Sequence, residues 1–380
     1  MKRSLRIAFV YFFWLTFCSS AAVAAPTISP TTSSTLQHGQ AVSIFGDSFG
    51  IKANPSPQFW DTVENQTAYS ALANGATIPT GAGKPWEAQC SYLGGSCVKF
   101  ITTANEQRGK SKATYKSSDT ESGYLEGRTI AATGKMYISW WWKPATDPVS
   151  GSHSSKFVRL SNSSDVVNKT FSWTQMHSYA FRTDQGYCQG GGADWATWTG
   201  NVNQWNFQEV WIDKATRTYT IRVNGQAIAN NVSWSSCTGF DFDHVWSIGW
   251  DAGGETPPAI TSWMDDIYVD NSFSRVMICN QGTFGGSTHC EMQIPSSWNN
   301  SQISLTVNQG TFLDGTTAYL YVVDASGIAN SSGYPVAFGT GGTGDVMPPT
   351  VTAFTMPASA TSLTVAVSSF VATDAVGIAG

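Results

Sequence analysis

Hydrophobic and polar residues alternate over two neighbouring runs, residues 207–212 and 218–223, which the polar stretch 213–217 separates. Because successive side chains of a strand point to opposite faces, this alternation predicts two strands. The Asn224-Gly225 dipeptide that follows predicts a turn, since both residues tolerate a positive φ. We therefore expect a β-hairpin that leads into a tight turn.

Short apolar runs separated by polar, Gly-rich stretches recur along the chain, and no long segment shows the period of an amphipathic helix. Charged residues make up only 12% of the chain, against roughly 25% in an average soluble protein. Both features are typical of all-β proteins, in which many short strands form a sandwich or a barrel. The further expected strands are residues 98–102, 124–125, 135–143, 157–160, 173–182 and 245–250.

Two motifs resemble the laminin-G-like and concanavalin-like jelly rolls. The first is the hairpin described above, which contains a tryptophan-bearing strand and ends in V-N-G at residues 223–225. The second is D-D-I-Y-V-D-N at residues 265–271, which resembles the last strand of these domains. The resemblance implies a jelly-roll sandwich over residues 54–272, in which the last strand lies beside the first.

Residues 25–52 end in G-D-S-F-G and resemble the first third of an IPT/TIG-like immunoglobulin domain. The rest of that pattern returns later, with Trp298 ahead of I-S-L-T-V and with G-T-T-A-Y-L-Y-V-V starting at Gly315. The resemblance implies one immunoglobulin-like β-sandwich, residues 25–53 and 273–340, that the jelly roll splits. Adjacent first and last strands would bring the two ends of such an insert together. Three separate modules in a row are the alternative.

Residues 341–380 begin with a Gly-rich linker, and the remainder resembles the tandem immunoglobulin-like repeats of bacterial surface proteins. The segment is about half as long as such a sandwich, which needs about 100 residues. We expect a linker and a truncated repeat that is poorly ordered, because a half-sandwich leaves strand edges open.

Residues 1–24 have the pattern of a secretory signal peptide. A positively charged start precedes an apolar run at residues 7–17, and residues 22–24 give the small-x-small cleavage pattern. The apolar run is too short for a mature transmembrane anchor. These features predict export across the inner membrane, to the cell surface or the medium.

Six cysteines remain after residue 24. An even number in an exported chain favours disulfides over metal binding or thiol catalysis. Sequence proximity favours the first two of the following pairs and elimination leaves the third: Cys90–Cys97, Cys279–Cys290 and Cys188–Cys237.

Tryptophan is unusually frequent: of 16 tryptophans, all but Trp14 and Trp298 fall within residues 58–271. In the run I-S-W-W-W-K, strand alternation predicts Trp140 and Trp142 in the core and Trp141 on the outer face of its sheet. An exposed aromatic face beside hydrogen-bonding groups suits the apolar face of a sugar ring. The candidate platform residues are Trp141, Trp195, Trp198, Trp211 and Tyr137. The alternative is that these aromatic residues are ordinary core between two sheets.

The predicted strand at residues 173–182 carries Gln175, His177 and Tyr179 on one face, and Arg159 could lie on a neighbouring strand. This set resembles the catalytic residues of jelly-roll polysaccharide lyases. The resemblance implies that Arg or Gln neutralises a uronate carboxylate while Tyr or His moves the C5 proton. The alternative is that the strand belongs to an ordinary binding groove.

Related jelly rolls often hold a structural Ca²⁺ where the first and last strands meet. The resemblance implies Asp61 and Glu64, with Asp265 and Asp266, as oxygen ligands. Alternatively, Asp265 hydrogen-bonds a loop backbone and Asp266 is solvated.

The net charge of −5 is spread along the chain, and no Lys/Arg block follows the first six residues, which argues against nucleic-acid binding. No closely spaced carboxylates of the kind that cleave glycosidic bonds occur on one strand. The leading hypothesis is an exported, non-catalytic carbohydrate-binding or adhesion protein whose partner is a polysaccharide or a glycoconjugate. The alternatives are a polysaccharide lyase acting on acidic glycans and a purely structural surface module.

Overall fold

A computed structural model of the chain describes residues 24–117, 123–148, 156–175, 181–184, 197–233, 241–251, 260–339, 350–357, 359, 367 and 369–373. Regular structure in these residues consists of strands and three short 3-10 turns, without an α-helix. The fold is therefore all-β, as the composition and the strand pattern predict. No helix in this described part of the chain is long and apolar enough to cross a membrane.

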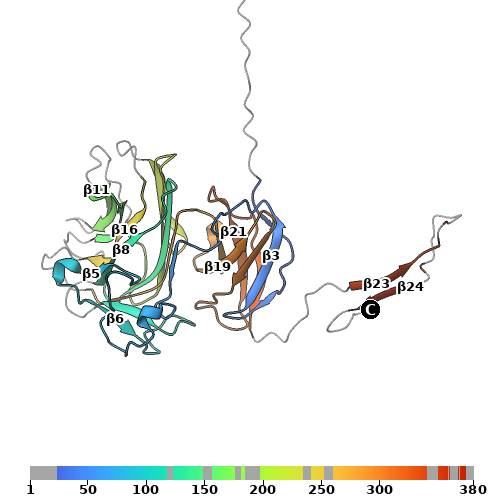
Figure 1. The fold of residues 1–380 in the computed structure, drawn as a ribbon, viewed down its shortest axis with the longest axis horizontal. Coiled ribbons are helices and arrows are strands. Elements are labelled where there is room, and N and C mark those ends of the chain that lie inside the picture. Colours follow the sequence, from blue (N-terminus) through green and yellow to red (C-terminus); the bar gives the residue numbers. More distant parts are fainter. Residues whose placement is uncertain are drawn as a thin grey trace, which may run out of the picture.

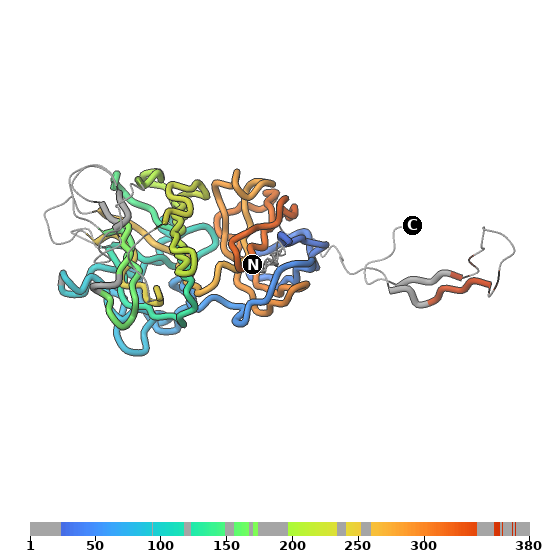
Figure 2. The backbone as a smooth tube through the Cα atoms, turned by 90° about the horizontal axis from the view of Figure 1, so that it is seen from above, coloured from blue at the N-terminus to red at the C-terminus, as the bar shows by residue number. Residues whose placement is uncertain are grey.

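Two segments far apart in the sequence, residues 27–47 and 275–338, form one β-sandwich, which we call the split domain. Strand β3 pairs antiparallel with β20, which places Ile44 opposite Ile303. Figure 2 shows the blue N-terminal segment lying against the orange C-terminal one. The strand order is β1-β3-β20-β19-β18-β21-β22-β2. The elements are β1 (Thr27–Ile28), β2 (Thr35–Leu36), β3 (Ala41–Asp47), β18 (Arg275–Cys279), η3 (Phe284–Gly286), β19 (Cys290–Trp298), β20 (Gln302–Thr306), β21 (Thr317–Val323) and β22 (Tyr334–Phe338).

The split domain has two layers because β19 changes partner along its length. Its first half pairs with β18 and its second half with β20, and the register shifts between Pro295 and Ser297. Such a shift bends the strand, so β19 passes from one layer to the other. Alternate residues of the facing strands then fill the core: Val42, Ile44, Ile303 and Leu305 with Val276, Ile278, Leu320, Val322, Val336 and Phe338.

The strands between these segments form a second sandwich, the inserted domain, residues 59–270 (Figure 1). Its boundary sheet has the order β15-β14-β13-β9-β17-β7-β6, and its outer sheet has the order β12-β11-β10-β16-β8-β5. The first strand, β4, pairs antiparallel with the last, β17, which brings the two ends of the domain together. The elements are β4 (Phe59–Asp61), η1 (Thr67–Tyr69), β5 (Ala88–Gln89), η2 (Ser91–Leu93), β6 (Val98–Ile101), β7 (Thr114–Ser117), β8 (Gly123–Thr129), β9 (Lys135–Pro144), β10 (Lys156–Asn162), β11 (Asp165–Gln175), β12 (Phe181–Asp184), β13 (Asn206–Asp213), β14 (Thr218–Val223), β15 (Gln226–Ser233), β16 (His244–Asp251) and β17 (Ser262–Asp270).

The predicted hairpin is present: β13 pairs with β14, with Val210 opposite Ile221. The turn that follows has φ values of 49° at Asn224 and 73° at Gly225. It lies against the split domain so closely that a Cβ on Gly225 would be 2.0 Å from the carbonyl oxygen of Ser287. Glycine is therefore required by both the backbone conformation and the contact between the domains.

Strand β9 distributes its aromatic residues as the alternation predicts. Trp140 and Trp142 lie in the core of the inserted domain, while Tyr137 and Trp141 lie on the opposite face of the boundary sheet. The expectation that this opposite face is exposed is wrong, because the split domain covers it. The split-domain residues in contact with this face include Met277, Met292, Tyr321 and Val323.

The single strand expected over residues 173–182 is also wrong. Strand β11 ends at Gln175 and β12 begins at Phe181, and the two pair antiparallel with these residues opposite each other. The chain therefore reverses direction between them. Residues 176–180 lie outside the described part of the chain.

Two of the predicted disulfides are confirmed, Cys90–Cys97 and Cys279–Cys290. The second joins the end of β18 to the start of β19, whereas Cys188–Cys237 lies outside the described residues. Near the C-terminus, β23 (Thr350–Thr355) and β24 (Ser369–Thr373) pair with each other and with no other described strand.

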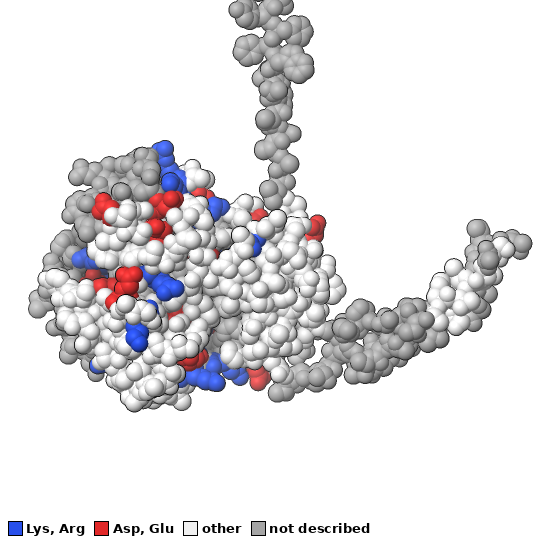
Figure 3. Space-filling view, in the orientation of Figure 1, with Lys and Arg blue, Asp and Glu red and all other residues white. Residues whose placement is uncertain are grey.

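Charged side chains are sparse on the surface. On the face shown in Figure 3, acidic and basic residues are scattered over the inserted domain, and the split domain is almost free of them. This face offers no basic patch of the kind that binds a phosphate backbone.

Candidate functional site

A buried arginine joins the two domains. The Arg108 side chain, carried by the loop between β6 and β7, is fully buried and donates to Glu291 of β19 through Nη1 at 2.8 Å and Nη2 at 2.9 Å. It also pairs with Asp266 of β17 and lies over the Trp141 ring, 4.5 Å from its centroid. Since a buried cation needs such partners, Arg108 holds the inserted domain against the split domain in one arrangement.

Glu291 is the centre of this contact. Its Oε1 lies 2.7 Å from His289 Nε2 and accepts the backbone N–H of Thr311 at 2.9 Å. Burial works to raise the pKa of the Glu291 carboxyl, but the Arg108 charge and the His289 hydrogen bond outweigh it and lower the pKa to about 2. Glu291 is therefore ionised at every pH at which the protein is expected to work.

This lowered pKa predicts how the stabilisation by Glu291 depends on pH. The pKa is about 2 in the folded protein against an ordinary 4.5, so ionised Glu291 stabilises the fold above pH 4.5, and this contribution is lost as the pH falls toward 2. We expect the difference in unfolding free energy between the wild type and Glu291→Gln to be largest near neutral pH and to shrink over that window. Urea titrations across the acid range measure it, and a difference that stays constant with pH would contradict the assignment.

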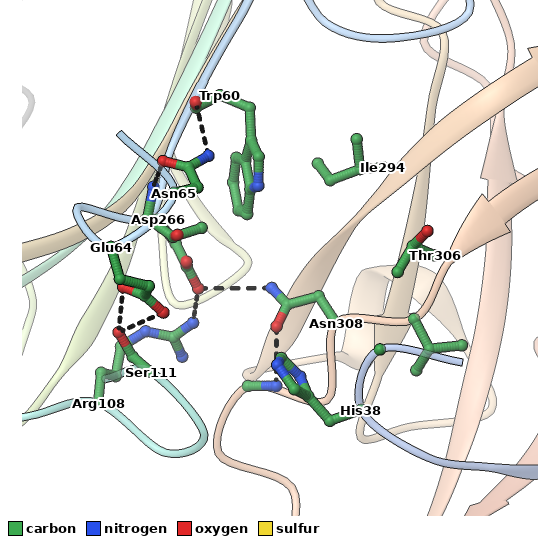
Figure 4. A pocket seen from close by; sticks show the side chains of 14 residues that line it. His38, Trp60, Glu64, Asn65, Arg108, Ser111, Asp266, Ile294, Thr306 and Asn308 are labelled. Carbon is green, nitrogen blue, oxygen red and sulfur yellow. Dashed lines mark hydrogen bonds and ion pairs between the residues drawn. The ribbon is translucent and has the colours of Figure 1, made fainter. Parts of the chain in front are cut away.

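A partly open cavity of about 310 Å³ lies on one side of Arg108, between the two domains (Figure 4). Trp60 and Glu64 of the inserted domain and Asn308 of the split domain point into it. Asn308 Nδ2 donates to Asp266 at 3.4 Å, and Glu64 accepts Ser111 Oγ at 3.3 Å. Burial raises the pKa of Glu64. Most of the polar groups here thus bind each other.

A larger groove of about 680 Å³ lies on the other side of the contact between Arg108 and Trp141. Trp141 lines the groove, whereas Arg108 lines the cavity. The stack of Arg108 on Trp141 therefore separates the two spaces. The groove contains a second tryptophan, Trp205, which is half-buried. Its described lining is Trp141, Thr199, Asn201, Gln204, Trp205, Val223, Asn224, Gln226, Ala227, Ile228, Thr288, His289 and Thr311. Both domains contribute, and these described lining residues include no carboxylate, lysine or arginine.

Asn206, the first residue of β13, positions the loop that carries Trp205. Its buried amide donates to the carbonyl oxygens of Asn201 at 2.9 Å and Gln204 at 2.7 Å, and its Oδ1 accepts the N–H of Asn201 at 2.7 Å. Asn224 adds a fourth contact by donating to the same Oδ1 at 3.0 Å. The loop is therefore fixed to the strand before any ligand binds, which lowers the entropy cost of binding.

The predicted sugar-binding residues lie in different parts of the structure. Trp141 lines the groove but is 4% exposed, Tyr137 is fully buried, and Trp211 packs against the domain boundary. Trp198 is buried in the core of the inserted domain and donates to Gln208 at 3.2 Å. Trp195 lies outside the described residues. Tyr137 and Trp198 thus pack within the protein, and Trp211 is half-buried at the domain boundary.

Of the predicted lyase residues, only the Arg159 side chain is described. It forms an ion pair with Asp251 at 2.6 Å and lies over the Trp246 ring on the outer sheet. His177 and Tyr179 lie outside the described residues, and only the backbone of Gln175 is described. The alignment of Gln175 with His177 on one face of a strand therefore stays a prediction.

Each of the four carboxyl groups expected to hold calcium has a hydrogen-bond or ion-pair partner within the protein. Asp61 accepts Trp86 Nε1 at 2.9 Å and Tyr115 OH at 2.7 Å. Asp265 Oδ1 accepts the N–H of Asp266, and Oδ2 is buried without a partner in the described part of the chain. Burial raises the pKa of both Asp61 and Asp265. No described group of three or more acidic, His or Cys side chains could hold a metal ion, so calcium binding stays a prediction.

No family model and no curated protein matches the chain. Among solved structures, the binding domain of botulinum neurotoxin serotype D is similar with a TM-score of 0.32 and 11% identity, over 60% of this chain and 67% of that one. The catalytic domain of a GH131 β-glucanase from Podospora anserina gives 0.32 and 12%, over 56% and 91%. Domain 4 of AbnA, an extracellular GH43 arabinanase from Geobacillus stearothermophilus, in complex with arabinotriose, gives 0.31 and 12%, over 46% and 75%. These likenesses are too weak to carry an argument about function.

Sequence reasoning missed the residues that form the groove, above all Trp205 and the amides of Asn201 and Gln204. The segment G-N-V-N-Q-W-N, residues 200–206, combines a tryptophan with several amide side chains ahead of a strand. This combination could have indicated a binding site, because a neutral sugar binds to amide groups and to the flat face of an aromatic ring.

Proposed function

We propose that the protein binds a neutral carbohydrate, without cleaving it, in the groove between the two domains. The observation that carries this proposal is the described lining of the groove, in which two tryptophans occur with amide and hydroxyl side chains and without a carboxylate. A sugar ring presents apolar C–H groups to an aromatic face and hydroxyl groups to amides. Glycoside hydrolysis needs a pair of carboxyl groups beside the bond, which this lining does not supply.

The groove has the size and construction of a ligand site. Its volume of about 680 Å³ falls within the roughly 300–1,000 Å³ typical of such sites. The Asn206 hydrogen bonds fix the loop at one wall, and the Arg108–Glu291 contact fixes the two domains. The binding surface is therefore formed in advance.

We further propose that the protein acts outside the cytoplasm. The two described disulfides are compatible with an oxidising compartment, and the signal-peptide pattern of residues 1–24 supports export. Attachment to a cell surface and a role in adhesion stay predictions.

Replacing Trp205 by alanine tests the proposal. We expect retention on the neutral polysaccharide that binds the wild type to weaken about 30-fold or more, because a central aromatic contact often contributes about 2 kcal/mol or more to binding. Affinity electrophoresis on a panel of neutral and uronate-containing polysaccharides, with absorbance followed for new C4–C5 double bonds, measures binding and lyase activity together.

Tyr92→Ala is the matched control, because Tyr92 is 74% exposed and lies on η2, outside the groove lining. Unfolding curves must show that both variants keep the wild-type stability. Wild-type retention in Trp205→Ala would refute the groove as the binding site. Absence of retention on the whole panel would favour the structural module, and rising absorbance would favour the lyase.

A further inference from the structure

A second hollow, of about 330 Å³, lies at the edge of the inserted domain where β4 begins, and its chemistry differs from that of the groove. Lys84 and Arg128 both line it, and the described residues of its lining include no carboxylate. Lys84 is exposed, and Arg128 is half-buried. No ion pair joins either cation to a carboxylate among the described residues. The hollow therefore presents two positive charges to a ligand, neither of them paired with a carboxylate in the described part of the chain.

Arg128 is held in place by contacts that leave its charge unpaired. Its guanidinium lies over the Phe59 ring, 4.1 Å from the centroid, and Nη1 donates to the carbonyl oxygen of Pro85 at 3.5 Å. Its Nε is buried and has no acceptor among the described residues. An anion that reaches the guanidinium from the hollow would form charge-assisted hydrogen bonds, which are stronger than those to neutral groups.

Two carboxyl groups lie near enough to attract Arg128, those of Asp61 and Glu87. Asp61 is bound to Trp86 and Tyr115, and Glu87 is exposed outside the lining. Neither forms a hydrogen bond or an ion pair with the guanidinium among the interactions described. These two carboxyl groups reduce the positive potential of the hollow, but neither residue is part of its described lining.

The remaining lining fits a sugar. The half-buried Trp60 provides aromatic surface. Gln58 Oε1 accepts the N–H of Ala131 at 3.4 Å, and the Gln58 amide N–H₂ makes no described hydrogen bond. Trp60 also lines the cavity of Figure 4, so a chain longer than one sugar could continue over the indole. Two cations beside aromatic and amide groups match an anionic ring substituent better than a nucleic acid, whose binding needs many more positive charges.

We propose that this hollow is a second binding site, for an acidic sugar residue whose carboxylate or sulfate group is held by Lys84 and Arg128. This site is separate from the neutral groove and shares no lining residue with it. The proposal therefore does not depend on the groove being correct.

The test uses the full chain and two probes, an oligogalacturonate and a sulfated galactose oligosaccharide of equal length, with a neutral oligosaccharide for comparison. Titration calorimetry should show that the wild type binds at least one acidic probe. Lys84→Gln should weaken that binding about tenfold, and Lys84→Gln/Arg128→Gln should abolish it, because a hydrogen bond to a charged group typically contributes about a factor of ten or more. The probe that binds identifies the carboxylate or the sulfate as the ligand group.

The control is Lys112→Gln/Arg217→Gln, which makes the same change in net charge at two exposed positions outside the hollow. Wild-type affinity in this control supports a local site, and an equal loss would show general charge attraction and overturn the proposal. No binding of either acidic probe by the wild type would also overturn it. If Arg128→Gln unfolds the protein, Lys84→Gln alone decides, because that side chain is exposed. Binding of neutral polysaccharide should survive in every folded variant, which separates a failure here from a failure of the groove.

Discussion

Replacing Arg108 by methionine is expected to lower the free energy of unfolding by about 3–5 kcal/mol. The substitution keeps much of the side-chain volume but removes the cation that lies between Glu291 and Asp266. Both carboxyl groups would then be buried without the guanidinium that pairs with them, which is far more costly than losing an exposed pair. Equilibrium urea unfolding measures the loss.

Lys110→Met is the matched control, two residues along the same loop. Lys110 lies 3.8 Å from Asp314, and their side chains are 43% and 54% exposed, so this pair should contribute about 0–1 kcal/mol. A second comparison separates the charge from the packing: Arg108→Met/Glu291→Met should recover part of the loss, because an apolar pair can replace a buried ion pair. A loss below about 1 kcal/mol in Arg108→Met would contradict the role assigned to this residue.

The same substitution should weaken binding in the groove. Arg108 belongs to the inserted domain and Glu291 to the split domain, while Trp141 and Thr311 line the groove directly beside this contact. If the two domains lose their fixed arrangement, the two walls no longer face each other in one geometry. Binding at Lys84 and Arg128 should be less affected, because the residues of that hollow belong to the inserted domain or to the segment leading into β4.

Alternation along the strands predicted the faces of β9 correctly, because the pleat alone decides that Trp140 and Trp142 point away from Trp141. It could not predict what covers the face of Trp141. The covering residues Met277 and Met292 follow more than 130 residues later, and only the tertiary fold brings them there. The sequence pattern therefore distinguishes two faces of a strand but does not show which of them meets water.

Arg108 was missed for a related reason. It occurs in the polar segment N-E-Q-R-G-K-S-K, residues 105–112, which has the composition of an exposed loop. Glu291 offered a clearer signal, since it lies between Cys290 and Met292 in a strand that is otherwise apolar at its start. A charge in such a run predicts a buried ion that needs a partner, although the sequence does not identify the partner.

Two loop glycines, Gly109 and Gly310, lie close together at the domain boundary. Replacing Gly310 is the second substitution expected to have a large effect on stability. Gly310 has φ of 54°, and a Cβ there would lie 1.9 Å from the carboxyl carbon of Glu291. Its carbonyl oxygen accepts the N–H of Lys110 at 3.0 Å, and a Cβ on Gly109 would lie 2.1 Å from that oxygen. An alanine at Gly310 would therefore strain the backbone and displace the carboxylate that binds Arg108.

We expect Gly310→Ala to lower the free energy of unfolding by about 2–6 kcal/mol, the sum of about 1–3 kcal/mol of backbone strain and about 1–3 kcal/mol of overpacking. Gly315→Ala isolates the first contribution, because Gly315 also has a positive φ, 84°, but its Cβ would meet nothing within 4 Å. The difference in unfolding free energy between the two variants, measured by urea titration, gives the cost of displacing Glu291. Equal losses of stability would show that the contact between the domains tolerates the added methyl group. Retention of neutral polysaccharide should fall in Gly310→Ala and persist in Gly315→Ala, since Thr311, the residue after Gly310, lines the groove.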